Sequence, residues 1–391
     1  MKNKLFFLNV SIIVLFSISK ISAQTSTIPW TASGTNTYTN PLGNNVGINT
    51  TTPLGKLHVN NGSVLFDGAT TGATPTSGVG TRMMWIPTKS AFRAGLISAL
   101  PLFDQWDAAN IGIGSCAFNQ NTKASGANSA ALGIYTTASN AQAFACGYTT
   151  VASGPNSFAS GYLSQATGDK ATAISWGNLA SGTASFATGS GTVASGAYSS
   201  SFGYHPTASG QSAIAAGTYT TAQSFSSFVI GRYNKTGTYS ATTWVGTDPV
   251  FVIGNGTGTG TFARNAVTVL KNGNVGIGTE LLSNPNNYRL AVNGSIGAKE
   301  VKIETSSTTW PDYVFDKDYV LLPLNELDAY LKKNNHLPDI PGREQVKTDN
   351  GVYVGEMQVK LLQKIEELTL YLLEQNREFE KIKIELELLK K

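Results

Sequence analysis

Apolar and polar residues alternate along this chain in a pattern that recurs every fourteen residues, eight times between Ser115 and Gly231. Each repeat contains a five-residue segment, such as Ser129–Gly133, in which residue character alternates with period two, as in a β-strand. Positions fourteen residues apart are called a column here. The column of Ala131 is small, with alanine or serine from Ala131 to Ala215. The opposite side is bulkier, and its columns include Phe144, Phe158, Phe186, Ile214 and Phe228, and Leu132, Ile174, Phe202 and Ile230.

Three further columns are nearly invariant. They hold Ala124, Ala138, Ala152, Ala166, Ala180, Ala194, Ala208 and Ala222; Gly133, Gly147, Gly161, Gly189, Gly203, Gly217 and Gly231, interrupted by Ser175; and Gly126, Gly154, Gly168, Gly182, Gly196 and Gly210, interrupted by Asn140. Strict self-similarity at a short period predicts stacked coils, each with two short strands and two tight turns. A coil filled by alanine and glycine gains little from burial, at about 25 cal/mol per Å². We therefore expect the bulkier columns to face other chains.

One sequence phrase occurs on both sides of the repeats, as residues 45–60 and 274–296. The first copy contains Asn-Val-Gly-Ile and then Lys-Leu-His-Val-Asn, and the second contains Asn-Val-Gly-Ile and then Arg-Leu-Ala-Val-Asn. This duplication predicts a β-module on either side of the array, in the position of a cap. By the same pattern rules, strands are predicted at residues 56–59, 63–66, 250–256 and 266–273.

The composition changes near Lys299, where charged residues become frequent and glycine becomes rare. A short helix is predicted from Leu324 to Asn334, and Pro338 and Pro341 prevent it from continuing. A longer helix follows, with a heptad seam in which Gln375 is the one polar member. The seam consists of Leu361, Ile365, Leu368, Leu372, Gln375, Phe379, Ile382, Leu386 and Leu389. It predicts a parallel three-stranded coiled coil, and the alternative is an amphipathic helix that packs on its own domain.

The N-terminus has the layout of a secretory signal peptide. Lys2 and Lys4 precede an apolar run from Leu5 to Ile18, and Ile21–Ala23 forms a small-residue cleavage site. Its removal would lower the formal net charge from +4 to +1. A nearly neutral mature chain gives no electrostatic reason to expect nucleic acid as a partner. We expect an exported protein at the cell surface, in the outer membrane or outside the cell.

The repeats resemble the head of trimeric autotransporter adhesins, the YadA-like left-handed parallel β-roll. This resemblance implies a homotrimeric, elongated surface head. The chain ends at Lys391 in a charged helix, without the alternating membrane strands that such adhesins carry, so their membrane barrel is not expected here. His336–Pro341 and Gly355–Met357, followed by Leu361–Leu368, distantly resemble the endosialidase-type intramolecular chaperone of tail fibres. The alternative function is therefore a tail-fibre-like receptor-binding component, with self-cleavage as its enzymatic variant.

No constellation of catalytic residues is evident. His58, His205 and His336 lie in different modules, and Cys116 and Cys146 are two repeats plus two positions apart, too far for a disulfide. We interpret both cysteines as small buried apolar residues. The Gly-Thr run at residues 254–260 lacks phosphate-loop spacing and is interpreted as a loop.

Self-cleavage is not expected either, because the serines at 306 and 307 have no positioned base in the sequence motif that such chaperones use. We therefore predict a non-enzymatic protein without catalytic, cofactor-binding or metal-binding residues and without a cofactor.

The sequence thus predicts a mainly β fold: a left-handed parallel β-roll with β caps and neck, a small α/β C-terminal domain and a terminal coiled coil. The predicted domains are 1–23 (signal peptide), 24–110 (N-terminal β cap), 111–235 (head), 236–298 (β neck), 299–356 (chaperone-like domain) and 357–391 (coiled coil). The expected partners are two further copies of the chain and a host-surface or matrix protein or a glycan. The expected role is adhesive or structural.

Overall fold

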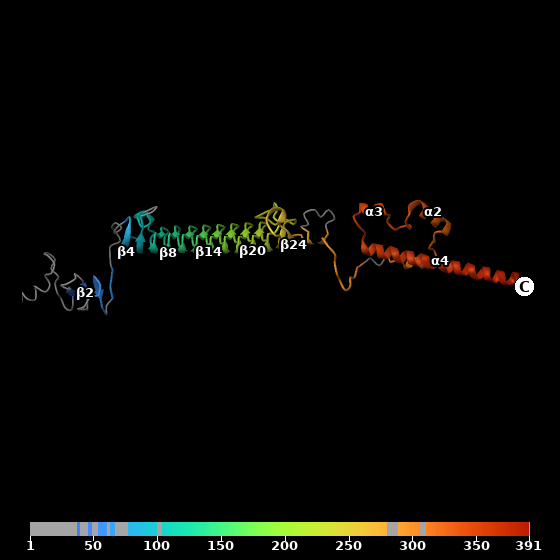
Figure 1. Cartoon of the computed structure of the whole chain (residues 1–391), viewed down its shortest axis with the longest axis horizontal. Coiled ribbons are helices and arrows are strands. Elements are labelled where there is room, and N and C mark those ends of the chain that lie inside the picture. Colours follow the sequence, from blue (N-terminus) through green and yellow to red (C-terminus); the bar gives the residue numbers. More distant parts are fainter. Residues whose placement is uncertain are drawn as a thin grey trace, which may run out of the picture. The chain divides into compact units, whose positions relative to one another are not determined.

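The computed structural model describes residues 37–39, 46–48, 54–60, 63–66, 77–99, 104–279, 288–304 and 310–390. The chain divides into two compact units, Met1–Ser295 and Ile296–Lys391. The first unit is built from β-strands and the second from helices (Figure 1). The predicted signal peptide lies outside the described residues.

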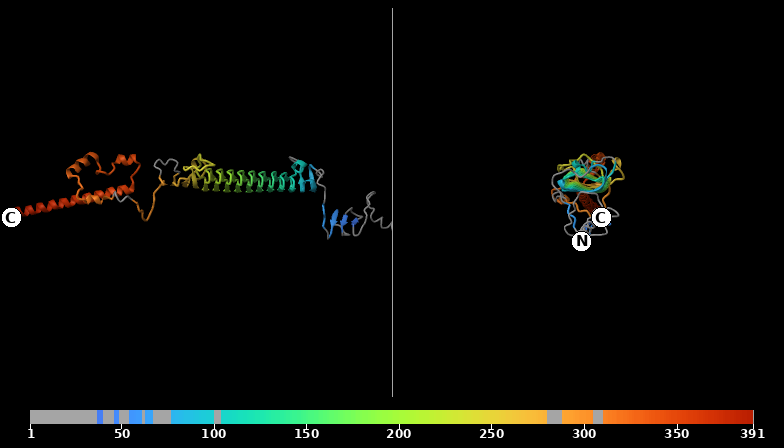
Figure 2. Two further views of the ribbon diagram at one scale, coloured as in Figure 1. Left: turned by 180° about the vertical axis from the view of Figure 1, so that it is seen from behind. Right: turned by 90° about the vertical axis from the view of Figure 1, so that its left-hand side faces the viewer.

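The repeats form a parallel β-solenoid in which every coil adds one strand to each of two sheets (Figures 1 and 2). The five-residue strands of the long sheet are β6 (Cys116–Gln120), β8 (Ala130–Ile134), β10 (Phe144–Tyr148), β12 (Phe158–Tyr162), β14 (Thr172–Trp176), β16 (Phe186–Ser190), β18 (Ser200–Tyr204), β20 (Ile214–Thr218) and β22 (Phe228–Arg232). The two-residue strands of the short sheet are β7 (Lys123–Ala124), β9 (Thr137–Ala138), β11 (Val151–Ala152), β13 (Gln165–Ala166), β15 (Leu179–Ala180), β17 (Val193–Ala194), β19 (Thr207–Ala208) and β21 (Thr221–Ala222). Adjacent strands pair in a register of fourteen residues, as Phe144 with Phe158. The predicted mainly β fold with a parallel solenoid of fourteen-residue coils is confirmed.

The interior of each coil is filled by alanine from both sheets. Ala145 from the long sheet and Ala152 from the short sheet are fully buried, and so are most other members of their two columns. Serine and threonine line the corners of the coil, where the Ser129 Oγ donates a hydrogen bond of 2.7 Å to the Gly126 carbonyl oxygen. The predicted division of each strand into a small inner side and a bulkier outer side is confirmed.

Glycine is needed where consecutive coils approach most closely. Gly147 has a φ of 114°, and a Cβ at this position would lie 2.0 Å from the Gly161 carbonyl oxygen. Ser175 stands in the same column with a φ of 93°. Residues with a side chain rarely adopt a positive φ, which explains why glycine dominates the column.

An antiparallel hairpin extends the long sheet at the N-terminal end of the solenoid. It consists of β4 (Gly80–Ile86) and β5 (Ala91–Ile97), joined by η1 (Pro87–Lys89). Ile86, Ile97 and Trp106 are fully buried in a separate apolar cluster, and the Trp106 Nε1 donates to the Thr122 carbonyl oxygen at 2.9 Å. This hairpin and η2 (Ala108–Asn110) adjoin the first coil, whereas the predicted cap at residues 45–60 belongs to a different sheet.

That different sheet has three short strands, β1 (Thr37–Thr39), β2 (Val46–Ile48) and β3 (Leu57–Val59). The strand predicted at residues 56–59 is therefore confirmed. The strand predicted at residues 63–66 is wrong, because this segment has no strand partner and no regular structure. Its three consecutive apolar side chains remain exposed.

Four strands extend the long sheet beyond the last coil. They are β23 (Pro249–Asn255), β24 (Asn265–Leu270), β25 (Val275–Ile277) and β26 (Leu290–Val292). The strands predicted at residues 250–256 and 266–273 are thus found, with the second ending earlier. The Gly-Thr run leads from β23 into η3 (Gly260–Phe262), so its interpretation as a loop is confirmed. The interior here changes from alanine to Val229 and Val252.

The second unit contains η5 (Pro311–Phe315), α2 (Leu324–Asn334), α3 (Arg343–Thr348) and α4 (Val354–Leu389). The predicted bounds of α2 are confirmed, and α4 begins seven residues before the first seam leucine. Residues 296–304 and 310–390 contain no strand, so the described part of this unit is helical rather than α/β. Apolar and polar residues alternate at residues 301–304, but this segment pairs with no strand among the described residues and has no regular structure.

Candidate functional surface

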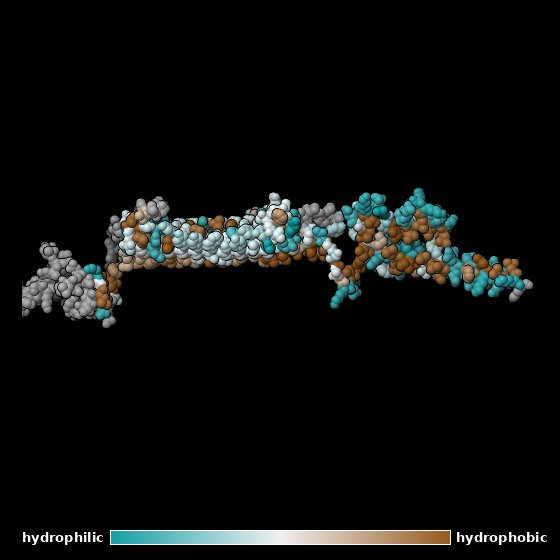
Figure 3. Space-filling model, in the orientation of Figure 1, coloured by the Kyte–Doolittle hydropathy of each residue, from teal (hydrophilic) through white to brown (hydrophobic). Residues whose placement is uncertain are grey.

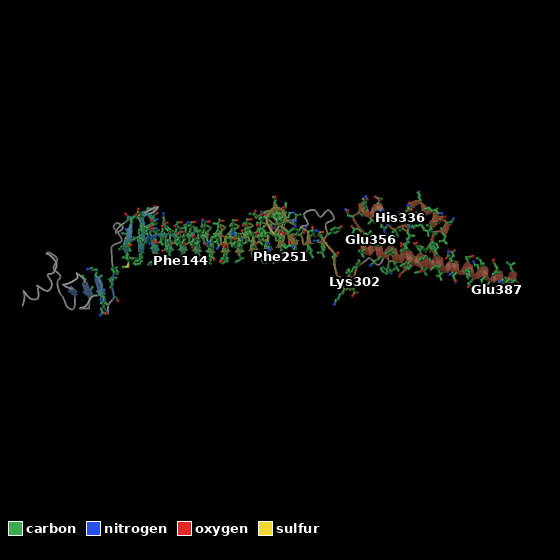
Figure 4. All side chains as sticks on the ribbon, in the orientation of Figure 1. Phe144, Phe251, Lys302, His336, Glu356 and Glu387 are labelled. Atoms are coloured by element: carbon green, nitrogen blue, oxygen red, sulfur yellow. The ribbon has the colours of Figure 1, made fainter. Side chains whose placement is uncertain are left out.

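The outward side of the long sheet carries two largely apolar columns, called the apolar face here, which Thr172 and Ser200 interrupt in the first column and Ser160 and Thr188 in the second. Strand register connects Phe144, Phe158, Phe186, Ile214, Phe228, Phe251, Val269, Val275 and Leu290 in the first column, and Leu132, Ile174, Phe202, Ile230, Ile253, Val267, Ile277 and Val292 in the second. Figure 3 shows apolar residues along the lower edge of the solenoid. Phe144 and Phe251 lie along that edge in Figure 4.

The apolar face is uncovered in the single chain, although the interior of the coil is complete. Phe202 and Phe228 are 37% and 41% exposed, whereas their inward-facing neighbours Ser201 and Val229 are 0% and 3% exposed. Phe144 and Phe158 stack on each other with ring centroids 5.3 Å apart. A large exposed surface of mainly apolar character marks an interaction site.

A third outward column is aromatic and is called the aromatic ridge. It comprises Tyr148, Tyr162, Trp176 and Tyr204, each 41–50% exposed. Tyr148 and Tyr162 stack with centroids 5.1 Å apart. The adjacent turn column continues this arrangement at the C-terminal end of the solenoid. There His205 stacks on Tyr219, and Tyr219 on Tyr233, both at 5.0 Å.

The solenoid is almost free of charge. Between Ser115 and Gly231 only Lys123, Asp169 and Lys170 are ionisable to a full charge at neutral pH. Lys170 and Asp169 form an exposed ion pair of 2.9 Å, and their hydrogen bond lowers the pKa of Asp169 and raises that of Lys170. Long-range electrostatic steering of a charged ligand therefore has little basis on this surface.

The cysteines are free, as predicted, and lie on strands β6 and β10. Their predicted burial is wrong, because both are half-buried on the apolar face instead of inside the coil. Burial raises the pKa of the Cys116 and Cys146 thiols, and the nearby positive charge of Arg93 opposes this rise at Cys116. A raised pKa keeps both groups as thiols at neutral pH, which makes them poor nucleophiles.

The histidines remain apart, on β3 for His58, in a solenoid turn for His205 and after α2 for His336. Among the residues that the structure describes, no group of three His, Cys, Asp or Glu side chains is placed to hold a metal ion. The serines at 306 and 307 lie outside those residues. The expectation that the chain has no catalytic, cofactor or metal residues stays a prediction.

The seam of α4 is exposed from Leu361 to Leu389, with Leu361 48%, Ile365 59% and Phe379 64% exposed. A different side of the helix packs within the unit, through Tyr371 against the chain at Leu322, whose carbonyl oxygen accepts a hydrogen bond from the Tyr371 hydroxyl. The seam is thus not used for packing on its own domain.

Polar contacts also hold the packed side of α4 against the segment before α2. The Tyr319 hydroxyl donates to Glu367 Oε1 at 2.6 Å, and the Lys364 Nζ lies 2.9 Å from the same oxygen. Burial and the Glu367 hydrogen bond raise the pKa of Tyr319 to about 12. Beyond these contacts, an open groove of about 570 Å³ is lined by Leu321–Leu324 and by Gln375, Phe379 and Ile382. Three residues of the seam thus form one wall of the groove.

Within the described ranges, no helix combines the length and the apolar character needed to cross a membrane. A family model described as the YadA head domain repeat matches the chain at residues 124–150, 152–174 and 180–205, in two copies. A search of curated proteins finds no match. The matched residues all lie in the parallel solenoid and include parts of its apolar face. The solenoid is therefore similar to YadA head repeats, which indicates an adhesin-like surface fibre.

Proposed function

We propose that this protein is an exported homotrimeric fibre with an adhesive or structural role at the cell surface or outside the cell. The observation that carries the proposal is the apolar face. Its residues are half-exposed on coils whose interior is already filled, so further burial requires another molecule. The likeness to the head repeats of trimeric adhesins favours two more copies of this chain in that place.

The trimer would present an uncharged, repetitive surface instead of a concave pocket. Serines recur along the short-sheet side, and the aromatic ridge runs along one margin of the apolar face. Many equivalent weak contacts on one rigid body gain strength through multivalency. We propose a host-surface or matrix protein or a glycan as the ligand, and we propose no enzymatic activity.

The C-terminal unit would align the three chains. Its exposed α4 seam has the spacing of a coiled coil, and a coiled coil fixes the register of the strands that it joins. Stacking of the solenoids could then proceed from an aligned end. This role agrees with the chaperone-like resemblance of residues 299–356. Deletion of the residues after Gly355 tests it: we expect loss of soluble trimer by light scattering, and an unchanged soluble trimer would contradict the role.

The trimer itself is tested by the solution mass of the mature chain, residues 24–391, by light scattering at micromolar concentration. A monomer would refute the proposal. Phe158→Asp places a charge on the apolar face and should dissociate the trimer, because a buried unpaired carboxylate costs several kcal/mol. Val151→Asp lies on the outward side of the short sheet in the preceding coil and serves as the matched control.

Adhesion is tested separately, by binding of the intact trimer to arrays of matrix proteins and glycans. We expect retention that falls steeply when the protein is made monomeric by Phe158→Asp, because avidity is lost. Equal retention of monomer and trimer would refute the multivalent mechanism.

A further inference from the structure

Each copy of the duplicated sequence phrase forms two strands that join the strand before it in the same three-stranded module. In the first module β1 pairs antiparallel with β2, which pairs parallel with β3. In the second module β24 pairs antiparallel with β25, which pairs parallel with β26. The parallel pairs have the same register, since Ile48 faces Val59 in one and Ile277 faces Val292 in the other.

The hydrogen bonds that flank the parallel pairs are also equivalent. The Val46 amide donates to the Lys56 carbonyl oxygen at 2.7 Å, and the Val275 amide donates to the Arg289 carbonyl oxygen at 2.8 Å. At the other end, the Asn60 and Asn293 amides each donate at 2.9 Å, to Ile48 and Ile277 respectively. The segments between the paired strands differ in length, so the module is preserved despite different connections.

Equivalent apolar side chains are exposed in the two modules. Ile48 and Ile277 are both 43% exposed, and Leu57 and Leu290 are 59% and 55% exposed. Further along, Val64 and Ile296 follow the same Gly-Ser pair and are 50% and 70% exposed. In the second module Ile277 and Leu290 continue the two columns of the apolar face without a break. The first module therefore carries apolar side chains equivalent to those at the C-terminal end of the apolar face, but on a sheet of its own.

Among the described residues, little packing stabilises the first module. Its strands have three residues each and form their own sheet, whose apolar residues Ile48 and Leu57 are exposed. Small sheets of short strands gain much of their stability from packing of an apolar face. Whatever covers both modules must offer the same complementary surface at two positions far apart along the chain. A parallel, in-register copy of this chain does so by construction.

We propose that the β1–β3 module is a second self-association junction, covered by the β1–β3 modules of the other copies of this chain. The proposal rests on the trimeric fibre proposed above and extends it to the segment before the solenoid. The solenoids of the associated chains would then be held in register by the second module after the last coil and by this junction before the first coil.

Short-spacer bismaleimide crosslinking of the full mature chain tests the junction. In a background of Cys116→Ala and Cys146→Ala, the probes are Leu57→Cys and Leu290→Cys. Their matched controls, His58→Cys and Ala291→Cys, lie one residue further on the same strands and point to the opposite side of each sheet. We expect covalent dimers at Leu57→Cys with a yield like that at Leu290→Cys and several-fold above both controls.

The outcomes separate this inference from the proposed function. Crosslinking at Leu290→Cys with no more than control yield at Leu57→Cys would overturn the junction and leave the fibre intact. Control yields at both positions in a protein of trimeric mass would also overturn it. Covalent heterodimers between a Leu57→Cys chain and a Leu290→Cys chain would show antiparallel association and overturn it too. A monomeric mass would refute the fibre itself.

Discussion

Substitution of Ala152 by leucine is the most direct perturbation of the solenoid interior. Ala152 is fully buried on β11, and the residues paired with it above and below are Ala138 and Ala166. It belongs to the same buried cluster as Ala145 and Ala159 of the long sheet. Leucine would add three carbon atoms to a coil that is already filled. Neighbouring strands lie about 4.8 Å apart, so the larger side chain cannot move into an adjacent coil without displacing another alanine.

Overpacking of a filled core typically costs about 1–3 kcal/mol. Three added carbons in so thin a coil place the expected loss at the upper end, about 3 kcal/mol. For a domain of this size a loss of 1 kcal/mol lowers the Tm by roughly 2–4 °C, so a decrease of roughly 6–12 °C is expected. The control is Val151→Leu on the same strand, since Val151 is half-buried on the outward side and Leu179 occupies the equivalent position two coils later.

Thermal unfolding followed by far-UV circular dichroism measures both variants, with light scattering to establish that each has the wild-type oligomeric state. Val151→Leu should change the Tm by little, because outward substitutions usually stay within about 0.5 kcal/mol. If Ala152→Leu melts at the same temperature as Val151→Leu, the alanine columns are not a close-packed interior and the reasoning is refuted.

Three other predictions concern the ends of the chain. The fully buried side chain of Arg93 donates hydrogen bonds to the carbonyl oxygens of Ser115 and Ala124 in the first coil, at 3.0 and 2.9 Å. Arg93→Met leaves these acceptors unpaired and should destabilise the N-terminal end of the solenoid by about 3 kcal/mol, which amide exchange in the first coils would report as faster exchange. Substitution of the exposed Arg232 by methionine is the control, and equal exchange in both variants would refute a stabilising role of Arg93. Burial and the nearby Asp312 raise the pKa of Glu366, so the folded unit binds the proton more tightly than the unfolded chain, and the contribution of Glu366 to stability is fully present below pH 4.5 and falls as the pH rises through the folded pKa. Glu366→Gln should therefore raise the unfolding midpoint at pH 7 and have a smaller effect near pH 4, and a pH-independent effect would contradict this. Gln375→Leu should stabilise the α4 seam but loosen its register or oligomeric state, measured by crosslinking and solution mass, and an unchanged register and state would show that Gln375 does not specify them.

The solenoid could be predicted from sequence because each coil repeats the same physical requirements. The Ala131 column had to be the inner side because only small side chains fit between two sheets so close together. The register of Phe144 with Phe158 followed from the period alone. The bounds of α2 followed from the prolines beyond it, because proline cannot continue a helix.

Features that occur once could not be predicted in this way. No sequence signal marks Arg93 as buried, since a cationic side chain is ordinarily assigned to the surface. The β4–β5 hairpin lies outside the repeat and has no period to reveal it. The segment at residues 63–66 has the apolar composition of a strand, yet a strand also needs a partner, and the sequence does not show which segments pair. The apolar face could be predicted as a set of columns, whereas its continuation into β24–β26 depended on pairings that only the structure gives.

In the middle of the solenoid, from β8 to β16, each long-sheet strand pairs with the strand of the coil before it and the strand of the coil after it, in the same register. A whole fourteen-residue unit can therefore be gained or lost without creating a new kind of contact. Each such event changes the length by about 4.8 Å and leaves both end structures and the C-terminal unit as they were. Gain or loss of whole units would thus adjust the length of the solenoid in fixed steps, with its means of assembly unchanged.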